Sequence, residues 1–170
     1  MFDPSAEFRI RHAEVPFIPT RCFVAGTEPG REIRIATIFD EFRRRFLSNP
    51  RWTLEPHSEV SIRVLRLTTS STSTEILERF SEVPGPEVPL SVVFQILKRQ
   101  PAGESGPLST TGFTNVFFVR DSTDCLQAVR VHWFGYGWHL GSYPVTRVIP
   151  WREGAHIVTR LDADPTPTTG

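Results

Sequence analysis

The chain has 170 residues, in which 19 Lys and Arg side chains balance 19 Asp and Glu side chains. Its length suits one domain with a single core, and its 39% hydrophobic and 22% charged residues are the proportions of a globular protein, which excludes a wholly disordered chain. The zero net charge gives no general attraction to nucleic acid or anionic membranes, and two cysteines are too few for a disulfide scaffold or a zinc site built on thiolates.

Residues 1–30 predict an extended N-terminal arm, because three prolines interrupt its apolar runs. A helix is predicted next, ending at Asn49 because the residue before a proline is pushed out of the helical region. The apolar face of this helix is formed by residues at the spacing of one helical side, namely Ile35, Ile38, Phe39, Phe42 and Phe46.

The middle of the chain predicts a strand and two further helices. Residues 58–67 alternate apolar and polar side chains, which is typical of a half-buried strand. Thr72 and Glu75 have the spacing of a capping box and predict a short helix that ends near Glu82. Pro89 then opens another helix, because a proline is tolerated in the first turn. Its apolar face consists of Leu90, Val93, Phe94 and Leu97.

From Phe113 onward the hydrophobic period is two residues, which indicates strands. They are predicted over 113–119, 125–134 and 138–143, with 155–161 as an optional fourth. The connections are too short for crossovers and predict an antiparallel meander. We therefore expect an α+β domain over 31–161, with amphipathic helices packed on one face of a C-terminal antiparallel β-meander, and a disordered tail over 162–170.

The alternation also predicts a register for the last hairpin. If Trp133 lies opposite Trp138, every apolar pair falls on one side of the sheet. His132 then lies opposite His139 on the other side, beside Arg130. This register requires a two-residue turn over 135–136 or a four-residue loop over 134–137.

The pair His132 and His139 is the best candidate for chemistry. Opposed side chains on neighbouring strands have Cβ atoms about 5 Å apart, close enough for two imidazoles to bind one zinc ion. A third ligand would come from His156, Asp121 or Asp124, but nothing in the spacing selects one. Two histidines on a polar strand face are more often without a metal, so we expect no cofactor and keep zinc as the alternative.

A second candidate surface is the polar side of the first predicted helix. Of the 19 basic residues in the chain, only Lys98 is not an arginine, and several arginines gather around this helix. They would supply phosphate contacts to nucleic acid without sequence preference. The residues concerned are Arg31, Arg34, Arg43, Arg44 and Arg51. However, Asp40 and Glu41 precede Arg44 and Arg45 by four residues, the spacing of ion pairs within a helix, so a salt-bridged solvent face is the competing interpretation.

Among the aromatic residues, Trp133 and Trp138 fit the core better than a stacking platform for bases or sugars. Tyr136, at the tip of the hairpin, is the aromatic side chain that we expect to contact a partner. Catalytic motifs are missing from the sequence: it holds no G-x-S-x-G elbow, P-loop, G-x-G-x-x-G or H-E-x-x-H. An enzyme is therefore unsupported, though not excluded.

The second half of the chain carries short motifs in a fixed order. They are Gln100-Pro101-Ala102-Gly103-Glu104, Gly112-Phe113-Thr114-Asn115, Val119-Arg120-Asp121, Val129-Arg130-Val131-His132-Trp133 with Gly135, Gly137-Trp138, Trp151-Arg152-Glu153-Gly154 and Val158-Thr159-Arg160. Through them the stretch 94–160 resembles a group of short uncharacterised bacterial proteins from candidate-phylum genomes. The resemblance implies a cytoplasmic bacterial protein with a Trp-containing C-terminal meander. It implies no catalytic or binding residues, because the function of the group is unknown.

Three functions follow as hypotheses. The first is a non-enzymatic binding or regulatory module with a protein partner, contacted through Arg43, Arg44 and Tyr136. The second is a nucleic-acid-associated protein that uses the Arg-rich helix face, and the third is a metal-dependent hydrolase at His132 and His139. No membrane partner is expected, because no apolar run approaches the ~18 residues that span a bilayer. An exposed apolar patch would favour the protein partner, and a continuous Arg stripe would favour nucleic acid.

Overall fold

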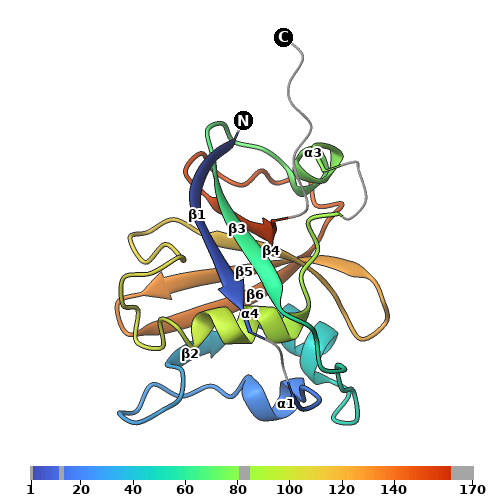
Figure 1. Ribbon diagram of the computed structural model, residues 1–170, viewed down its shortest axis with the longest axis vertical. Helices are drawn as coiled ribbons and strands as arrows, with labels where there is room; N and C mark the ends of the chain where they lie inside the picture. Colours follow the sequence, from blue (N-terminus) through green and yellow to red (C-terminus); the bar gives the residue numbers. More distant parts are fainter. Residues whose placement is uncertain (1, 12–13, 81–84, 162–170) are drawn as a thin grey trace.

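A computed structural model of the chain describes residues 2–11, 14–80 and 85–161. These residues form a seven-stranded mixed sheet with the strand order β1-β3-β7-β4-β5-β6-β2. In chain order the strands are β1 (Phe2–Ile10), β2 (Ile35–Ile38), β3 (Val60–Leu67), β4 (Asn115–Arg120), β5 (Leu126–Phe134), β6 (Gly137–Pro144) and β7 (His156–Arg160). The sheet is bent, so that β1 and β3 run at a steep angle to β5 and β6 (Figure 1).

The helices are short and lie between the strands in the chain. They are α1 (Pro19–Cys22), α2 (Asp40–Phe42), α3 (Ser73–Glu78), α4 (Leu90–Leu97) and a π-helical turn, η1 (Arg43–Leu47), which continues α2. Within the described residues, no helix has the length and apolar character needed to cross a membrane.

The predicted fold, helices packed on a C-terminal antiparallel meander, is wrong. β4, β5 and β6 do pair antiparallel through short turns, but β7 pairs parallel with β4, and β2 pairs parallel with β6. β3 and β1 extend the sheet beyond β7 in antiparallel fashion. The prediction extended the rule of short connections to the whole sheet, whereas both parallel pairs join segments that are far apart in the sequence.

The long helix predicted to end at Asn49 is wrong in its first part. Two of its five apolar positions, Ile35 and Ile38, lie instead in β2 and are buried beside β6. The chain turns into α2 and η1 only after Phe39. Pairing with β6 overrides the helical spacing, because strand formation depends on neighbours that a local pattern does not show.

The segment predicted as an extended arm, residues 1–30, contributes an edge strand to the sheet. Its β1 pairs with β3 from Phe2 opposite Leu67 to Ile10 opposite Val60. The tail predicted over 162–170 lies outside the described residues.

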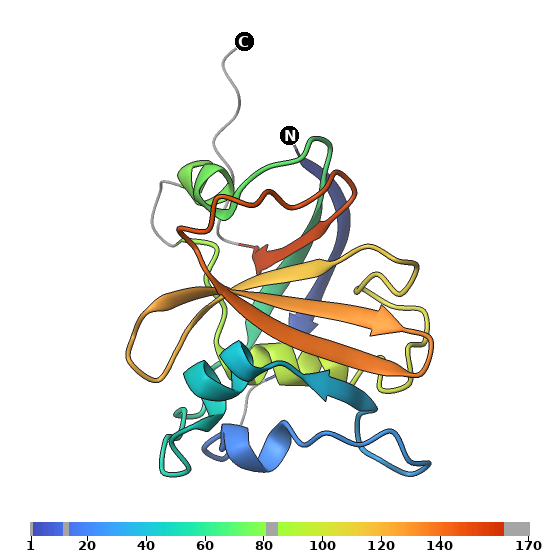
Figure 2. The same cartoon turned by 180° about the vertical axis from the view of Figure 1, so that it is seen from behind.

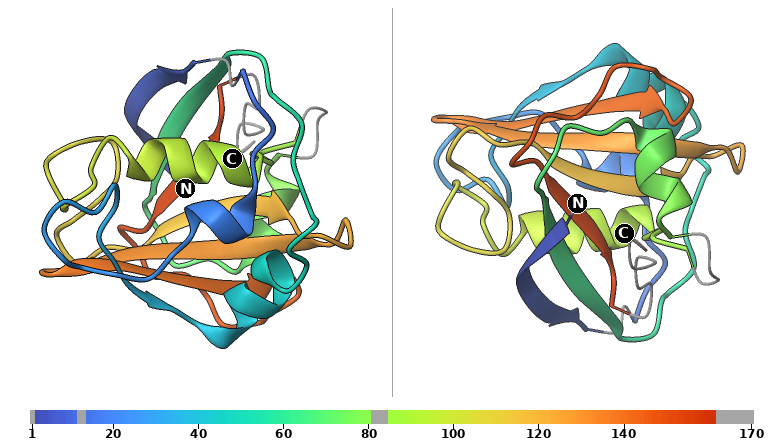
Figure 3. Two further views of the ribbon diagram at one scale, coloured as in Figure 1. Left: turned by 90° about the horizontal axis from the view of Figure 1, so that it is seen from below. Right: turned by 90° about the horizontal axis from the view of Figure 1, so that it is seen from above.

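Two predicted helix starts are confirmed. The Thr72 side chain accepts a hydrogen bond from the backbone N–H of Glu75, and the Glu75 carboxylate accepts one from the backbone N–H of Thr72, which caps α3. The predicted end of this helix at Glu82 lies outside the described residues. α4 begins directly after Pro89, and it is buried on nearly all sides because it lies in the bend of the sheet, between β1–β3 and β5–β6 (Figure 3).

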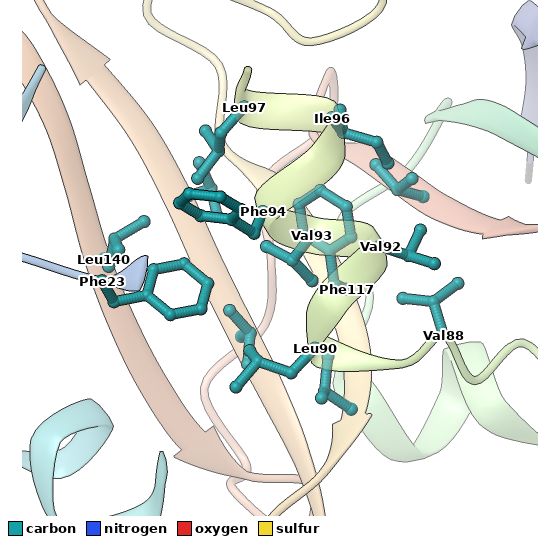
Figure 4. Packing of buried hydrophobic residues seen from close by; sticks show 14 of the residues in the cluster. Phe23, Val88, Leu90, Val92, Val93, Phe94, Ile96, Leu97, Phe117 and Leu140 are labelled. Carbon is teal, nitrogen blue, oxygen red and sulfur yellow. The ribbon is translucent and has the colours of Figure 1, made fainter. Parts of the chain in front are cut away.

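Two apolar clusters lie on opposite sides of the sheet. The inner cluster fills the bend around α4, and Figure 4 shows the side chains of α4 lying beside Phe23, Phe117 and Leu140. Its members include Phe23, Leu90, Phe94, Phe117 and Leu140. The outer cluster lies under α3 and the segment 145–155. Its members include Leu67, Ile76, Val116, Phe118 and Ile157.

The predicted register of β5 and β6 is confirmed: Trp133 lies opposite Trp138, and His132 lies opposite His139. A two-residue turn joins the strands, and its first residue, Gly135, has a φ of 43°. Glycine adopts such a φ without steric cost, and it is the residue that favours tight hairpin turns of this kind.

Buried polar side chains hold the loop between α4 and β4. The Gln100 amide accepts from the N–H of Leu108 (2.8 Å) and donates to its carbonyl oxygen (3.0 Å). The Asn115 amide makes the same two bonds to Ser109, at 2.8 and 3.0 Å. Trp138 donates from Nε1 to the Gln100 carbonyl oxygen (2.8 Å). These residues belong to the motif block of the second half, and here they position the loop.

Candidate functional site

The outer side of the sheet is covered over one half only. Above β3, β7 and β4 lie α3 and the segment 145–155, which we call the covered half. The Trp151 Nε1–H of that segment donates to Ser73 Oγ of α3 (2.9 Å), which joins the two parts of the cover. Over β5 and β6, no helix of the part of the chain that the structure describes lies on the outer side (Figure 2). We call this surface, from Arg130 to Phe134 and from His139 to Tyr143, the open face.

Arg130 is the central residue of the open face. It lies opposite Gly141 of β6. Its guanidinium carbon is 5.5 Å from the centroid of the Phe39 ring and 5.8 Å from that of Tyr143. A Cβ at position 141 would lie 3.8 Å from Arg130 Nε, which is an ordinary van der Waals contact, so the arginine side chain passes close to this glycine. Cation–π contacts with two rings hold this side chain in place.

No carboxylate of the described residues pairs with Arg130. Its Nε is buried and has no hydrogen-bond partner there. A buried donor without a partner is costly, and buried donors in folded proteins are nearly always bonded. The positive charge on this face is therefore uncompensated.

A second arginine lies on the same tyrosine. The guanidinium carbon of Arg147 is 3.9 Å from the centroid of the Tyr143 ring. Both arginines line a cavity of about 460 Å³ at the border between the open face and the covered half. The cavity wall also contains Phe113, His132, Phe134, Trp151, Arg152 and Glu153. The cavity wall therefore contains three arginines and one carboxylate.

The two predicted zinc ligands, His132 and His139, do face each other, but a ring lies against both. The centroid of the Phe134 ring is 4.4 Å from that of His132 and 4.8 Å from that of His139. Tyr136 and Phe39 also contact His139, at 5.7 and 6.3 Å between centroids, so His139 is only 8% exposed.

The positive charge of the open face acts on both histidines. Burial, followed by the charge of Arg130, lowers the pKa of His132 and of His139 below the ordinary histidine value. Both imidazoles are therefore neutral at pH 7 and can each donate and accept one hydrogen bond.

The third ligand that the zinc hypothesis needs does not join this pair. His156 lies on β7, and β4 separates β7 from β5. Asp121 is bound into the turn that follows β4, where its Oδ1 accepts from Thr123 Oγ1 at 2.7 Å. Over the described ranges, no group of three or more His, Cys, Asp and Glu side chains has an arrangement that could hold a metal ion.

The arginines of the predicted helix are largely tied to the protein itself. Arg44 pairs with Glu41, and Arg45 pairs with both Glu41 (2.8 Å) and Asp121 (3.4 Å). Arg43 donates from Nε to the Ile38 carbonyl oxygen at 3.0 Å. The expected pair between Glu41 and Arg45 is thus present, and Arg44 uses the same glutamate. These contacts use part of the donor set of each arginine that a continuous Arg stripe would direct to phosphate.

Of the remaining arginines named for nucleic acid, Arg31 pairs with Glu28 at 3.0 Å. Arg51 is exposed, and Arg34 is half-buried in the connection to β2. The sequence argument placed Arg31, Arg34 and Arg51 around one helix, whereas they lie in a loop, beside the start of β2 and in a turn.

Tyr136 lies at the hairpin tip and is 61% exposed. Sequence reasoning missed the roles of Arg130, Phe39 and Arg147. A signal for Arg130 was present, because the period of β5 places it beside His132, and Gly141 lies opposite. No local signal brings Phe39 or Arg147 to that face, because both come from other segments of the chain.

Compared with protein-family models, with curated proteins and with solved structures, the chain matches none of them. Its function is therefore argued from the geometry of the open face.

Proposed function

We propose that the protein is a non-enzymatic binding module, and that its open face docks an acidic segment of a protein partner. The observation that carries this proposal is Arg130, an uncompensated guanidinium fixed between Phe39 and Tyr143. Interfaces are enriched in arginine and aromatic residues, and residues of these types contribute most of their binding energy.

Exposed apolar side chains gather on and around the same face. Phe39 is 42% exposed, Phe134 52% and Tyr136 61%, and Ile149 of the segment 145–155 is 56% exposed. Contiguous exposed apolar surface with a polar rim marks a protein-binding site more often than a bare solvent face. The unpaired arginines supply the rim and select for acidic partners.

A peptide selection tests this proposal. Random peptides displayed on phage are selected on the immobilised protein, and the enriched peptides are titrated into ¹⁵N-labelled protein. We expect enriched peptides to contain acidic and aromatic residues. We expect their amide shift changes to lie in β5, β6 and the segment 145–155.

Two variants, each of which replaces an exposed apolar side chain by serine, control the experiment. Phe134→Ser on the open face should weaken an enriched peptide by roughly tenfold, which corresponds to about 1.4 kcal/mol. Val24→Ser, an exposed apolar position outside the open face, should leave the affinity unchanged. Selection that enriches no peptide, or shift changes that map to another surface, would contradict the proposal.

The nucleic-acid hypothesis is a second proposal, and it keeps Arg34 and Arg51 as its free arginines. It expects a salt-sensitive shift of random oligonucleotides, because phosphate contacts release counterions. The pairing of Arg44 and Arg45 with Glu41 reduces its support. The zinc hydrolase has no third ligand in the described part of the chain, and a cytoplasmic location stays a prediction of the sequence.

A further inference from the structure

At the border between the open face and the covered half, the positive charges outnumber the negative charges. Arg130, Arg147 and Arg152 line one cavity of about 460 Å³, and Glu153 is the one carboxylate in its wall. None of the three arginines has an ion pair or a side-chain hydrogen bond among residues 2–11, 14–80 and 85–161. Elsewhere, arginines such as Arg120 have such partners: Glu87 binds its guanidinium at 2.8 Å.

Two of these arginines, Arg130 and Arg147, lie against the same aromatic ring. The guanidinium carbons of Arg130 and Arg147 lie 5.8 Å and 3.9 Å from the centroid of the Tyr143 ring. Stacking uses the flat face of a guanidinium, whereas its N–H donors lie in the plane and point from its edge. The terminal N–H groups of both arginines are therefore free to bind one oxyanion.

We propose that this cavity is a subsite for a phosphate monoester, presented by a phosphorylated side chain of the protein partner. The inference rests on the proposed function, because it names the anchor of the segment that docks on the open face. A phosphate monoester carries about two negative charges at neutral pH, which matches an excess of two arginines over carboxylates. A single carboxylate would leave one of these charges uncompensated.

The rest of the wall suits the group that carries the phosphate. Phe113, Phe134 and Trp151 provide apolar and aromatic surface beside the arginines. His132 also lines the cavity, and its neutral imidazole can donate a hydrogen bond to a phosphate oxygen. Arginine clusters are a common means of recognising phosphorylated side chains, because the guanidinium edge fits phosphate oxygens.

The test uses N-acetyl-O-phosphotyrosine amide as the probe and isothermal titration calorimetry at pH 7.5. N-acetyltyrosine amide, N-acetylglutamate amide and adenosine monophosphate are titrated in parallel. We expect the phosphotyrosine probe to bind with a dissociation constant in the ~0.1–1 mM range. It should bind at least about tenfold more tightly than each of the other three, because charge-assisted bonds to phosphate are lost or misplaced in them.

Arginine variants identify the cavity as the binding site. Arg130→Gln and Arg147→Gln should each weaken the phosphotyrosine probe by roughly tenfold, since each removes a charge-assisted pair. Arg51→Gln, an exposed arginine outside the cavity wall, should leave the affinity unchanged. Near-ultraviolet circular dichroism confirms that each variant is folded. Arg147→Gln is the safer variant because, among the described residues, Arg147 has one cation–π contact and Arg130 has two.

Three results of these titrations would overturn the inference. Equal affinity for the glutamate probe would identify a carboxylate subsite, and tighter binding of adenosine monophosphate would identify a nucleotide site. No binding of the phosphotyrosine probe would remove the subsite, whereas the peptide selection would still decide whether the open face docks a partner. Binding of the probe without any enriched peptide would instead retain the subsite and contradict the docking proposal.

Discussion

The covered half and the open face are two parts of the outer side of one sheet, and they differ in the side chains that point outward and in what covers them. In the covered half, Val116, Phe118 and Ile157 point outward and are fully buried under α3 and the segment 145–155. On the open face, β5 presents Arg130 and His132 at the equivalent alternating positions. The covered half is stabilised by the burial of apolar side chains. On the open face, cation–π contacts of arginine side chains hold the aromatic rings in place.

The difference shows how a sheet can leave aromatic surface exposed to water. The rings of Phe39 and Tyr143 are partly covered by the guanidinium groups of Arg130 and Arg147. A guanidinium is weakly hydrated and stacks on rings, so it shields apolar surface and keeps a charged edge in solvent. Such a surface is suited to a partner that supplies the missing negative charge.

The largest expected effect is a difference between the covered half and the open face in how much an alanine substitution lowers the free energy of unfolding. Phe118→Ala in the covered half should lower the free energy of unfolding by about 3–5 kcal/mol, because it leaves a cavity in a fully buried cluster. Phe134→Ala on the open face should lower it by less than about 1 kcal/mol, because that ring is 52% exposed. Urea denaturation measures both, and equal losses would abolish the distinction between the halves.

A smaller effect is expected at the border of the two regions. Gly154 has a φ of 87°, and a Cβ there would lie 2.2 Å from Cε1 of the Phe113 ring, which lines the cavity. Gly154→Ala should therefore lower the free energy of unfolding by about 1–3 kcal/mol through backbone strain and overpacking. Thermal denaturation followed by circular dichroism measures the change.

Gly112→Ala is the matched control for this prediction. Gly112 has a φ of 96°, but nothing lies within 4 Å of the position of its Cβ. Gly112→Ala should therefore introduce backbone strain alone, and it should lower the free energy of unfolding by less than Gly154→Ala does. If the two substitutions cost the same, the close contact between Gly154 and Phe113 does not support the cavity wall.

The smallest expected effect is a dependence on pH. Burial and the charge of Arg130 lower the pKa of His132 and of His139, and burial and the charge of Arg66 lower the pKa of His156. The folded protein thus takes up fewer protons than the unfolded chain once the pH falls below about 6.5. Stability is fully present above that pH and decreases as the pH falls toward the lowered values.

Histidine variants assign this dependence to a region. The double variant H132Q/H139Q should flatten the fall in urea midpoint between neutral and mildly acidic pH more than His156→Gln does, because it removes two of the three groups. Denaturation series at several pH values provide the measurement. A steeper fall in the double variant would show that protonation of these histidines stabilises the open face.

Local sequence patterns predicted those parts of the fold that depend on neighbouring residues. The period of two along β5 and β6 yields the correct register, because one slip would place Val131 on the wrong side of the sheet. The capping box of Thr72 and Glu75 is likewise local. Both were correct because the residues that decide them are close in the sequence.

The errors concern contacts between distant segments. The spacing of apolar residues from Ile35 to Phe46 fits one face of a helix, and it fits a short strand followed by a helical turn equally well. Pairing with β6 selects the strand. The same is true of the site. The alternation places Arg130 and the two histidines together, but Phe39 and Arg147 reach the open face through the tertiary fold alone.

The strand order also constrains how the molecule assembles. Both edge strands, β1 and β2, precede the central strands in the chain, and β2 has its partner in β6, with Ile35 beside Trp138. During synthesis, the edge strand β2 must wait until the centre of the sheet has left the ribosome. Folds rich in such distant pairings have a high contact order and form slowly. The last hairpin, which bears the open face, is therefore also the template on which β2 pairs, and β7, the last strand of the chain, then joins β3 to β4.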